Sequence, residues 1–226
     1  MTEILSPPPN AIDLDRLFHR WPDFESAKDW RQAGFEILRD KEDKILVLSH
    51  KSAKRYLFKK YGSDDWRSPR EQLEKYQSRV TWAALLRSHI INNGLRHVVV
   101  PQKWLCTLPA ESGSKGKSPH VVVVERHRIL DADESAACYR RIDAEVVREL
   151  CTILFAFRGL DFKIRNVPFT RDGKIAFIDT ESLKPSSKKL RTRKNCYQKY
   201  IDTMLSKHRR LAEDVWNELV KTVDLK

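Results

Sequence analysis

Asp161-Phe-Lys163-Ile-Arg-Asn166 brings a carboxylate, a cation and an amide together within six residues of the chain. Thirteen residues after Asn166, Asp179 ends the apolar, strand-like run Ile-Ala-Phe-Ile. Carboxylate and amide oxygens are ligands that suit Mg²⁺, and a further carboxylate can accept the proton of a hydroxyl group. The stretch therefore predicts a site that could hold a divalent metal ion beside a carboxylate able to accept a proton.

The residues on both sides of this stretch predict the elements that carry it. Helices are expected over 133–140 and over 144–157, the second with Asp143 as its N-cap and Arg158-Gly159 at its end. Segments 166–169 and 174–178 predict the two strands of a hairpin, because the residues between them favour a tight turn. Asp179 then falls at the end of the second strand.

The first half of the chain predicts an antiparallel sheet with one long helix. Strand-like runs at 35–38, 45–48 and 56–60 follow one another closely, after short helices around 13–19 and 26–32. Ser68-Pro69-Arg-Glu71 predicts a capping box that opens a helix ending at Gly94. Two further strands are expected at 97–100, with an extension towards Leu105, and at 120–124.

The residue pattern and the element order together resemble the protein kinase-like superfamily, including its compact bacterial members and the antibiotic phosphotransferases. The resemblance covers residues 35 to 180 and implies an α+β, bilobal fold. Its N-lobe would be a five-stranded antiparallel sheet with one long helix, and its C-lobe would be reduced and mainly helical. The expected parts are a tail with short helices over 1–33, an N-lobe over 34–128 and a C-lobe over 129–226. The C-lobe would contain a catalytic-loop-like segment at 159–181 and a C-terminal helix from Tyr197 to Val223.

Residue matching to this superfamily implies a role for each member of the motif. Asp161 would be the catalytic base, and Lys163 would steady the phosphate during transfer. Asn166 and Asp179 would bind Mg²⁺. ATP and Mg²⁺ are the implied cofactors, and the acceptor would be a hydroxyl group of a protein or of a small molecule.

Two adjacent lysines end the third expected strand, and one of them would contact the phosphates of ATP. Strand alternation places Lys59 and Lys60 on opposite faces. Lys59 is preferred because Tyr-Leu-Phe-Lys59 resembles the end of the third kinase strand, and two exposed lysines are the alternative. Glu74 is the expected partner of the lysine, since Glu71 is used as a cap. Glu125 stands where a hinge would present backbone groups to adenine.

Several features depart from the kinase pattern. The turn over 40–43 is Asp-Lys-Glu-Asp, without the glycine loop that cradles phosphates. Gly159-Leu160 replaces the usual His-Arg, and Thr180-Glu181 replaces the usual Phe-Gly. The chain after Asp179 is short, with 47 residues. A catalytically inactive kinase-like binding module, a pseudokinase, is therefore the alternative to an active kinase.

The charge of the chain predicts a third function class. Lys and Arg number 43 against 31 Asp and Glu, a net charge of +12. The segment Lys184–Lys199 contains seven basic residues and no acidic one. It predicts either an anionic partner, such as nucleic acid, an acidic protein or a membrane surface, or a solvated connection before the last helix.

Composition and cysteine pattern favour a cytoplasmic globular protein. The chain is 41% hydrophobic and 33% charged, and it has no apolar run of the roughly 18 residues that cross a bilayer. The four cysteines form no C-x-x-C pair, and the N-terminal residues do not resemble a secretory signal. Export into another cell by a dedicated secretion machine stays compatible with this pattern.

Overall fold

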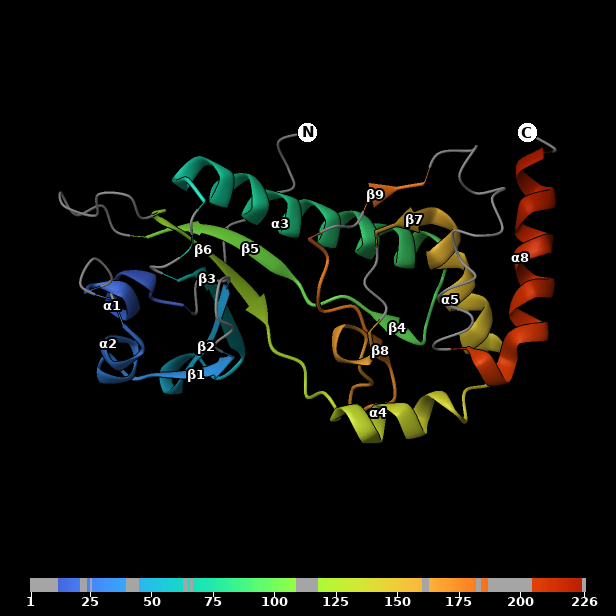
Figure 1. The fold of residues 1–226 in the computed structure, drawn as a ribbon, viewed down its shortest axis with the longest axis horizontal. Helices are drawn as coiled ribbons and strands as arrows, with labels where there is room; N and C mark the ends of the chain where they lie inside the picture. Colours follow the sequence, from blue (N-terminus) through green and yellow to red (C-terminus); the bar gives the residue numbers. More distant parts are fainter. Residues whose placement is uncertain are drawn as a thin grey trace. The chain divides into compact units, whose positions relative to one another are not determined.

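The computed structural model describes residues 12–20, 24, 26–39, 45–62, 65, 67–108, 118–159, 163–181, 184–186 and 205–224. The chain divides into two compact units (Figure 1), Met1–Ala84 with Pro101–Arg126 and Leu85–Val100 with His127–Lys226. Residues 12–33 pack within the first unit.

A five-stranded antiparallel sheet forms the centre of the first unit, as the sequence predicts. Its strand order is β1-β2-β3-β6-β5. The first three strands form the expected meander, and β6 then pairs with β3. The strands are β1 (Phe35–Arg39), β2 (Ile45–His50), β3 (Tyr56–Tyr61), β5 (Lys103–Thr107) and β6 (His120–Glu125).

Strand alternation gives this sheet two apolar faces, and each has its own core. Short helices α1 (Leu14–Phe18) and α2 (Ala27–Gln32) contribute to the core of one face, where the rings of Phe18 and Phe58 lie 5.5 Å apart. The other core joins Tyr61 and its strand neighbours to Tyr76 of the long helix α3 (Pro69–Asn92).

Helix α3 begins and ends at the residues that the sequence marks. The Ser68 N–H donates to Glu71 Oε2 over 2.8 Å, and the Glu71 N–H donates back to the Ser68 hydroxyl over 3.3 Å. Gly94 has φ of +63°, a left-handed conformation that favours glycine and ends the helix. The Tyr61 N–H donates to the Tyr76 hydroxyl over 2.6 Å, which ties α3 to β3.

A strand forms within 97–100 as expected, but its expected place in the five-stranded sheet is wrong. Residues Val98–Val99 form β4, which belongs to the second unit and pairs in parallel with β8 (Ile175–Ala176). The strand that completes the sheet is β5, which begins at Lys103. Pro101 separates the two strands, and proline cannot donate the hydrogen bond that a continuous strand would require.

The second unit is mainly helical, with two short strand pairs. Its helices include α4 (Ala132–Tyr139), α5 (Ala144–Ala156) and α8 (Arg209–Asp224), of which α5 and α8 pack side by side (Figure 1). The rings of Phe155 and Trp216 meet edge to face at 5.2 Å between these two helices. The C-terminal helix begins at Arg209, after a 3-10 turn over Ser206–His208, and residues 197–204 of the expected helix lie outside the described residues.

The turn over 170–174 forms where the sequence predicts it, but the two expected strands are shorter than predicted. Asn166 belongs to the 3-10 turn Ile164–Asn166, an isolated antiparallel bridge joins Phe169 to Ile175, and β8 ends at Ala176, three residues before Asp179. The Thr170 N–H donates to the Lys174 carbonyl over 2.7 Å, and Gly173 takes a left-handed φ of +83° in the turn. Short strands β7 (Phe157–Arg158) and β9 (Lys184–Pro185) pair antiparallel. Strand β7 directly follows α5 and directly precedes the catalytic-loop-like segment at 159–181.

Candidate functional site

The structure brings Asn166 and Asp179, the two expected metal ligands, into neighbouring positions. Asn166 closes the 3-10 turn Ile164–Asn166 and is 5% exposed. The N–H of Ile178, the residue before Asp179, donates to the Asn166 carbonyl over 3.0 Å. A second bond, from the Ala176 N–H to the Pro168 carbonyl over 2.8 Å, holds the two segments together. The arrangement places a carboxylate and an amide on adjacent backbone segments.

Asp179 follows β8 and is partly exposed, so its carboxylate can reach a ligand from solvent. The Glu181 N–H donates to Asp179 Oδ1 over 3.4 Å, which orients the carboxylate. Thr180, between the two acids, is fully buried. Hard oxygen donors of this kind suit Mg²⁺, which retains several waters and needs only one or two protein ligands.

Of the other two motif residues, the structure describes Lys163 but not Asp161. Lys163 precedes the 3-10 turn and is exposed. Asp161, the expected catalytic base, lies outside the described residues, and its role stays a prediction. The glycine-free turn at 40–43 also lies outside the described residues, as does the basic segment 184–199 except for its first three residues.

Lys59 and Lys60 have different environments, as strand alternation predicts. Lys60 is 4% exposed, and its Nζ donates to the carbonyl oxygens of Ser118 (2.6 Å) and His120 (3.2 Å). Lys59 is partly exposed and lies on the face of the sheet that packs against α3, together with Leu57. Lys60 is therefore a structural residue, which makes Lys59 the better nucleotide candidate. The alternative of two exposed lysines is wrong for Lys60.

Glu74 does not lie where a partner of Lys59 would lie. Its side chain is 60% exposed and accepts a hydrogen bond from Arg70 Nε over 3.2 Å, one turn earlier on the helix. The buried positions of α3 include Gln72, Tyr76 and Val80, and the helical repeat turns Glu74 away from them. The helical phase of the apolar residues could have excluded Glu74 from sequence alone.

Glu125 ends β6 and is bonded within the first unit. Its Oε2 accepts the Gln102 N–H over 3.2 Å, and its own N–H donates to the Gln102 carbonyl over 2.9 Å. The next N–H, of Arg126, donates to the Arg55 carbonyl over 2.8 Å. An adenine ring could use these two N–H groups only by replacing the bonds that they already make.

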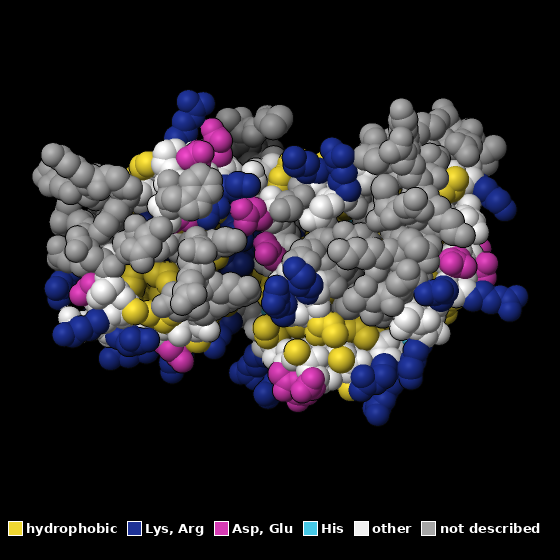
Figure 2. Space-filling view, in the orientation of Figure 1, with side chains coloured by type: hydrophobic (Ala, Val, Ile, Leu, Met, Phe, Trp, Pro, Cys, Tyr) yellow, Lys and Arg dark blue, Asp and Glu magenta, His cyan; other side chains and the backbone are white. Residues whose placement is uncertain are grey.

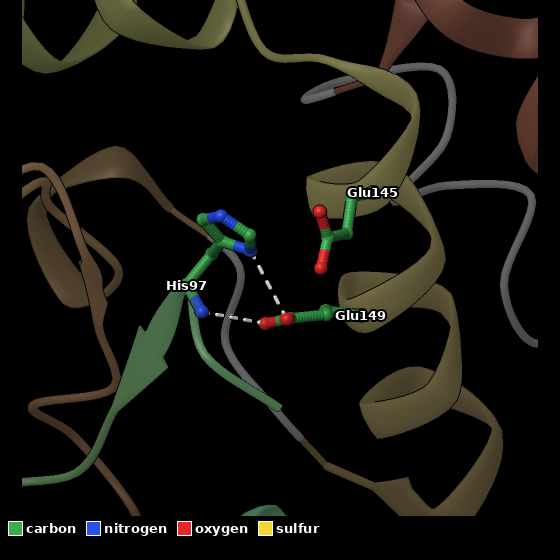
Figure 3. Close-up of side chains that lie close together, drawn as sticks. All are labelled: His97, Glu145 and Glu149. Atoms are coloured by element: carbon green, nitrogen blue, oxygen red, sulfur yellow. Dashed lines mark hydrogen bonds and ion pairs between the residues drawn. The ribbon is translucent and has the colours of Figure 1, made fainter. Parts of the chain in front are cut away.

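Sequence reasoning missed a cluster of His97, Glu145 and Glu149, shown in Figure 3. One ligand atom from each residue lies within 4.8 Å of the others. Glu149 is 5% exposed, and its Oε1 and Oε2 accept the N–H groups of Arg96 (2.7 Å) and His97 (2.8 Å). His97 Nδ1 lies 3.0 Å from Glu149 Oε1, so this ring nitrogen donates to the carboxylate.

These bonds favour a structural role for the cluster over a metal centre. Both Glu149 oxygens already accept backbone N–H groups, and a metal ion would have to compete with them. Glu145 is exposed, and its carboxylate faces the other two residues without bonding either of them. The sequence signal was a glutamate within the apolar positions of α5, but its partners lie about fifty residues away along the chain.

The buried cysteines do not contribute a reactive thiolate. Burial raises the pKa of the Cys106 and Cys151 thiols to about 12. At neutral pH these side chains are protonated and nucleophilically inert, because the thiolate is the reactive form. Cys196 lies outside the described residues.

The helices of the described residues include none that is long and apolar enough to cross a bilayer. Comparison of the chain with protein-family models and with curated proteins gave no match. The resemblance to kinase-like proteins therefore rests on the residues and the element order of this chain alone.

Proposed function

We propose that this protein is an ATP- and Mg²⁺-dependent phosphotransferase with a kinase-like bilobal fold, acting on a hydroxyl group of a protein or small molecule. The observation that carries the proposal is the hydrogen bond from the Ile178 N–H to the Asn166 carbonyl, which makes neighbours of two candidate Mg²⁺ ligands. The five-stranded antiparallel sheet, with a lysine of β3 facing α3, supports it independently.

In the proposed reaction the acceptor hydroxyl oxygen bonds to the γ-phosphorus of ATP, and the bond from that phosphorus to the bridging oxygen of ADP breaks. Asp161 accepts the hydroxyl proton. Asn166 and Asp179 would hold Mg²⁺, which would supply positive charge to neutralise the phosphate oxygens. Lys163 would supply positive charge at the phosphates, a role that gains weight because the turn over 40–43 lacks glycine.

Turnover of ATP by matched variants tests the proposal. Asp161→Ala and Asp179→Ala are expected to abolish turnover, because they remove the base and a metal ligand. Asp214→Ala is the matched control, since Asp214 is an exposed aspartate on α8, outside the proposed site. Turnover that persists in both site variants would refute this active site.

A kinase-like binding module without catalysis is the second candidate. The observation that favours it is the turn Asp-Lys-Glu-Asp over 40–43, which lacks the glycine loop that holds the phosphates in active kinases. Mg·ATP that raises the unfolding temperature without release of phosphate would support this function. Robust turnover would exclude it.

A further inference from the structure

We propose that Glu149 is a positioning residue that sets the location of Asp179 through the segment entering β4. This inference rests on the proposed function, in which Asp179 binds Mg²⁺. Glu149 itself touches neither metal nor nucleotide in this scheme. Its effect is carried by a continuous series of hydrogen bonds within the second unit.

The series begins at the Glu149 carboxylate. It accepts the backbone N–H of Arg96 over 2.7 Å. It also accepts the backbone N–H and the ring N–H of His97, over 2.8 and 3.0 Å, and Figure 3 shows these two bonds. Burying a carboxylate is costly unless its oxygens are hydrogen-bonded, and here three donors from one short segment satisfy it. The carboxylate therefore holds the peptide of His97 in one position relative to α5.

His97 in turn bonds strand β8 through its carbonyl, which belongs to the next peptide group. The His97 carbonyl accepts the Ile175 N–H over 2.8 Å, and the Val99 carbonyl accepts the Phe177 N–H over 2.9 Å. These bonds form the parallel pairing of β4 with β8, in which Val98 lies opposite Ile175. Because each of these strands is only two residues long, few other hydrogen bonds define their register.

Strand β8 leads directly to the candidate metal ligands. Ile178, one residue beyond Phe177, donates to the Asn166 carbonyl, and Asp179 follows it. A shift of the His97 peptide would move β8 and with it the relative position of Asn166 and Asp179. Small displacements of this kind matter, because mutation of residues that orient metal ligands typically lowers metal affinity by about 10- to 100-fold.

The test compares Glu149→Gln with Glu145→Gln in the full chain. Glutamine at 149 replaces one acceptor oxygen with an NH₂ group, which faces an N–H donor. Glu145 lies one turn earlier on the same helix face and, among the described residues, bonds none of the donors that Glu149 accepts. It is therefore a matched control for charge and location.

Two readouts separate positioning from a merely structural role. Hydrogen exchange of the Ile175, Phe177 and Ile178 amides is expected to be at least about tenfold faster in Glu149→Gln and unchanged in Glu145→Gln. The affinity for Mn²⁺, used as a spectroscopic substitute for Mg²⁺, is expected to fall by about tenfold or more in Glu149→Gln alone. His97→Ala removes one of the three bonds and is expected to give a smaller change in both readouts, so it carries the test if Glu149→Gln does not fold.

The outcomes are distinguishable. Unchanged exchange in Glu149→Gln would overturn the series of hydrogen bonds. Faster exchange with unchanged Mn²⁺ affinity would overturn positioning and leave Glu149 as a residue of stability only. A wild-type chain that binds neither Mn²⁺ nor Mg·ATP would overturn the proposed function and the metal part of this inference, while the exchange comparison would still decide whether Glu149 holds β8.

Discussion

At the scale of single residues, burial and partners decide function more than residue type does. Lys59 and Lys60 are adjacent and chemically identical, yet one lies partly exposed on the α3 face and the other is buried against two carbonyl groups. The two-residue repeat of a strand produces this division. Lys59 can therefore contact a ligand while Lys60 stabilises the fold.

Lys60→Ala is expected to lower the free energy of unfolding by about 2 to 3 kcal/mol, because it leaves the Ser118 and His120 carbonyl oxygens without their charged donor. Lys59→Ala is expected to cost less stability than Lys60→Ala, because Lys59 is partly exposed, and to weaken Mg·ATP binding. Urea unfolding and calorimetric titration measure the two effects. Equal losses of stability would contradict the distinction between the two lysines.

The lowered pKa values of two histidines predict that the free energy of unfolding decreases in mild acid. Burial, and then the charge of Lys60, lower the pKa of His120, while burial is the main cause that lowers the pKa of His50. The unfolded chain, with ordinary histidine pKa values near 6.5, therefore binds protons more readily than the folded chain. The free energy of unfolding should fall as the pH drops from about 7 through 6.5 towards the lower folded pKa values.

Unfolding in urea at several pH values between 7.5 and 5.5 measures this dependence. His120→Gln is expected to reduce the slope, because it removes one of the two groups. His19→Gln is the control, since His19 is an exposed histidine. A stability that rises in acid would contradict the sign.

At the scale of elements, the ends of helices show how local signals act. Gly94 ends α3 with φ of +63°, and a Cβ placed there would meet no atom within 4 Å. The cost of a side chain at this position is therefore a backbone cost alone. Gly94→Ala is expected to destabilise the protein by about 1 kcal/mol, and Gly94→Asn by less, because asparagine tolerates the left-handed region. Thermal unfolding of these two variants measures the losses of stability. Equal losses would exclude the backbone explanation.

Packing between helices contributes larger energies than their exposed charges. Trp216 is 3% exposed and meets Phe155 across the α5–α8 contact. Trp216→Ala is expected to cost about 3 to 5 kcal/mol, because it leaves a cavity between the helices. Glu218→Ala removes only the exposed pair with Arg148 (3.1 Å) and should cost at most about 1 kcal/mol. Denaturant unfolding measures the free energy of unfolding of both variants. Similar losses would contradict the larger contribution of the buried contact.

At the scale of the whole molecule, positive charge is the dominant property. Lys and Arg side chains recur over the visible face in Figure 2, in keeping with the net charge of +12. Arg158 and Lys184 lie directly opposite each other in the β7–β9 pair, and both are exposed. Like charges held opposite each other are unfavourable unless an anion lies near them. Lys184 also begins the basic segment, so this pair supports the anionic-partner hypothesis.

Binding to a DNA duplex is therefore expected to weaken steeply as salt rises, with a slope of about 0.9 in log–log form for each phosphate contacted. Replacing Lys188, Lys189, Arg191, Arg193 and Lys194 with Gln should lower both the affinity and this slope. Fluorescence anisotropy at several salt concentrations measures them. Binding that ignores salt, or that survives the five replacements, would exclude this function.

The sequence by itself determined most of the element content of this protein. The Ser68 capping box, the Asp143 cap and the glycines at 94 and 173 each act within one turn of the chain, and the structure has the expected elements at these places. Strand alternation likewise predicted that the two lysines of β3 face opposite ways. Such signals can be derived from sequence because both partners lie within a few residues of each other.

Only the tertiary structure decided which distant segments meet. It assigned β4 to β8 instead of to the sheet, buried Lys60 against Ser118, and placed Glu149 beneath the peptide of His97. These partners lie more than fifty residues apart, and no local preference specifies such a pairing. It depends on how apolar faces pack and on which buried polar groups find donors, and those are properties of the folded chain.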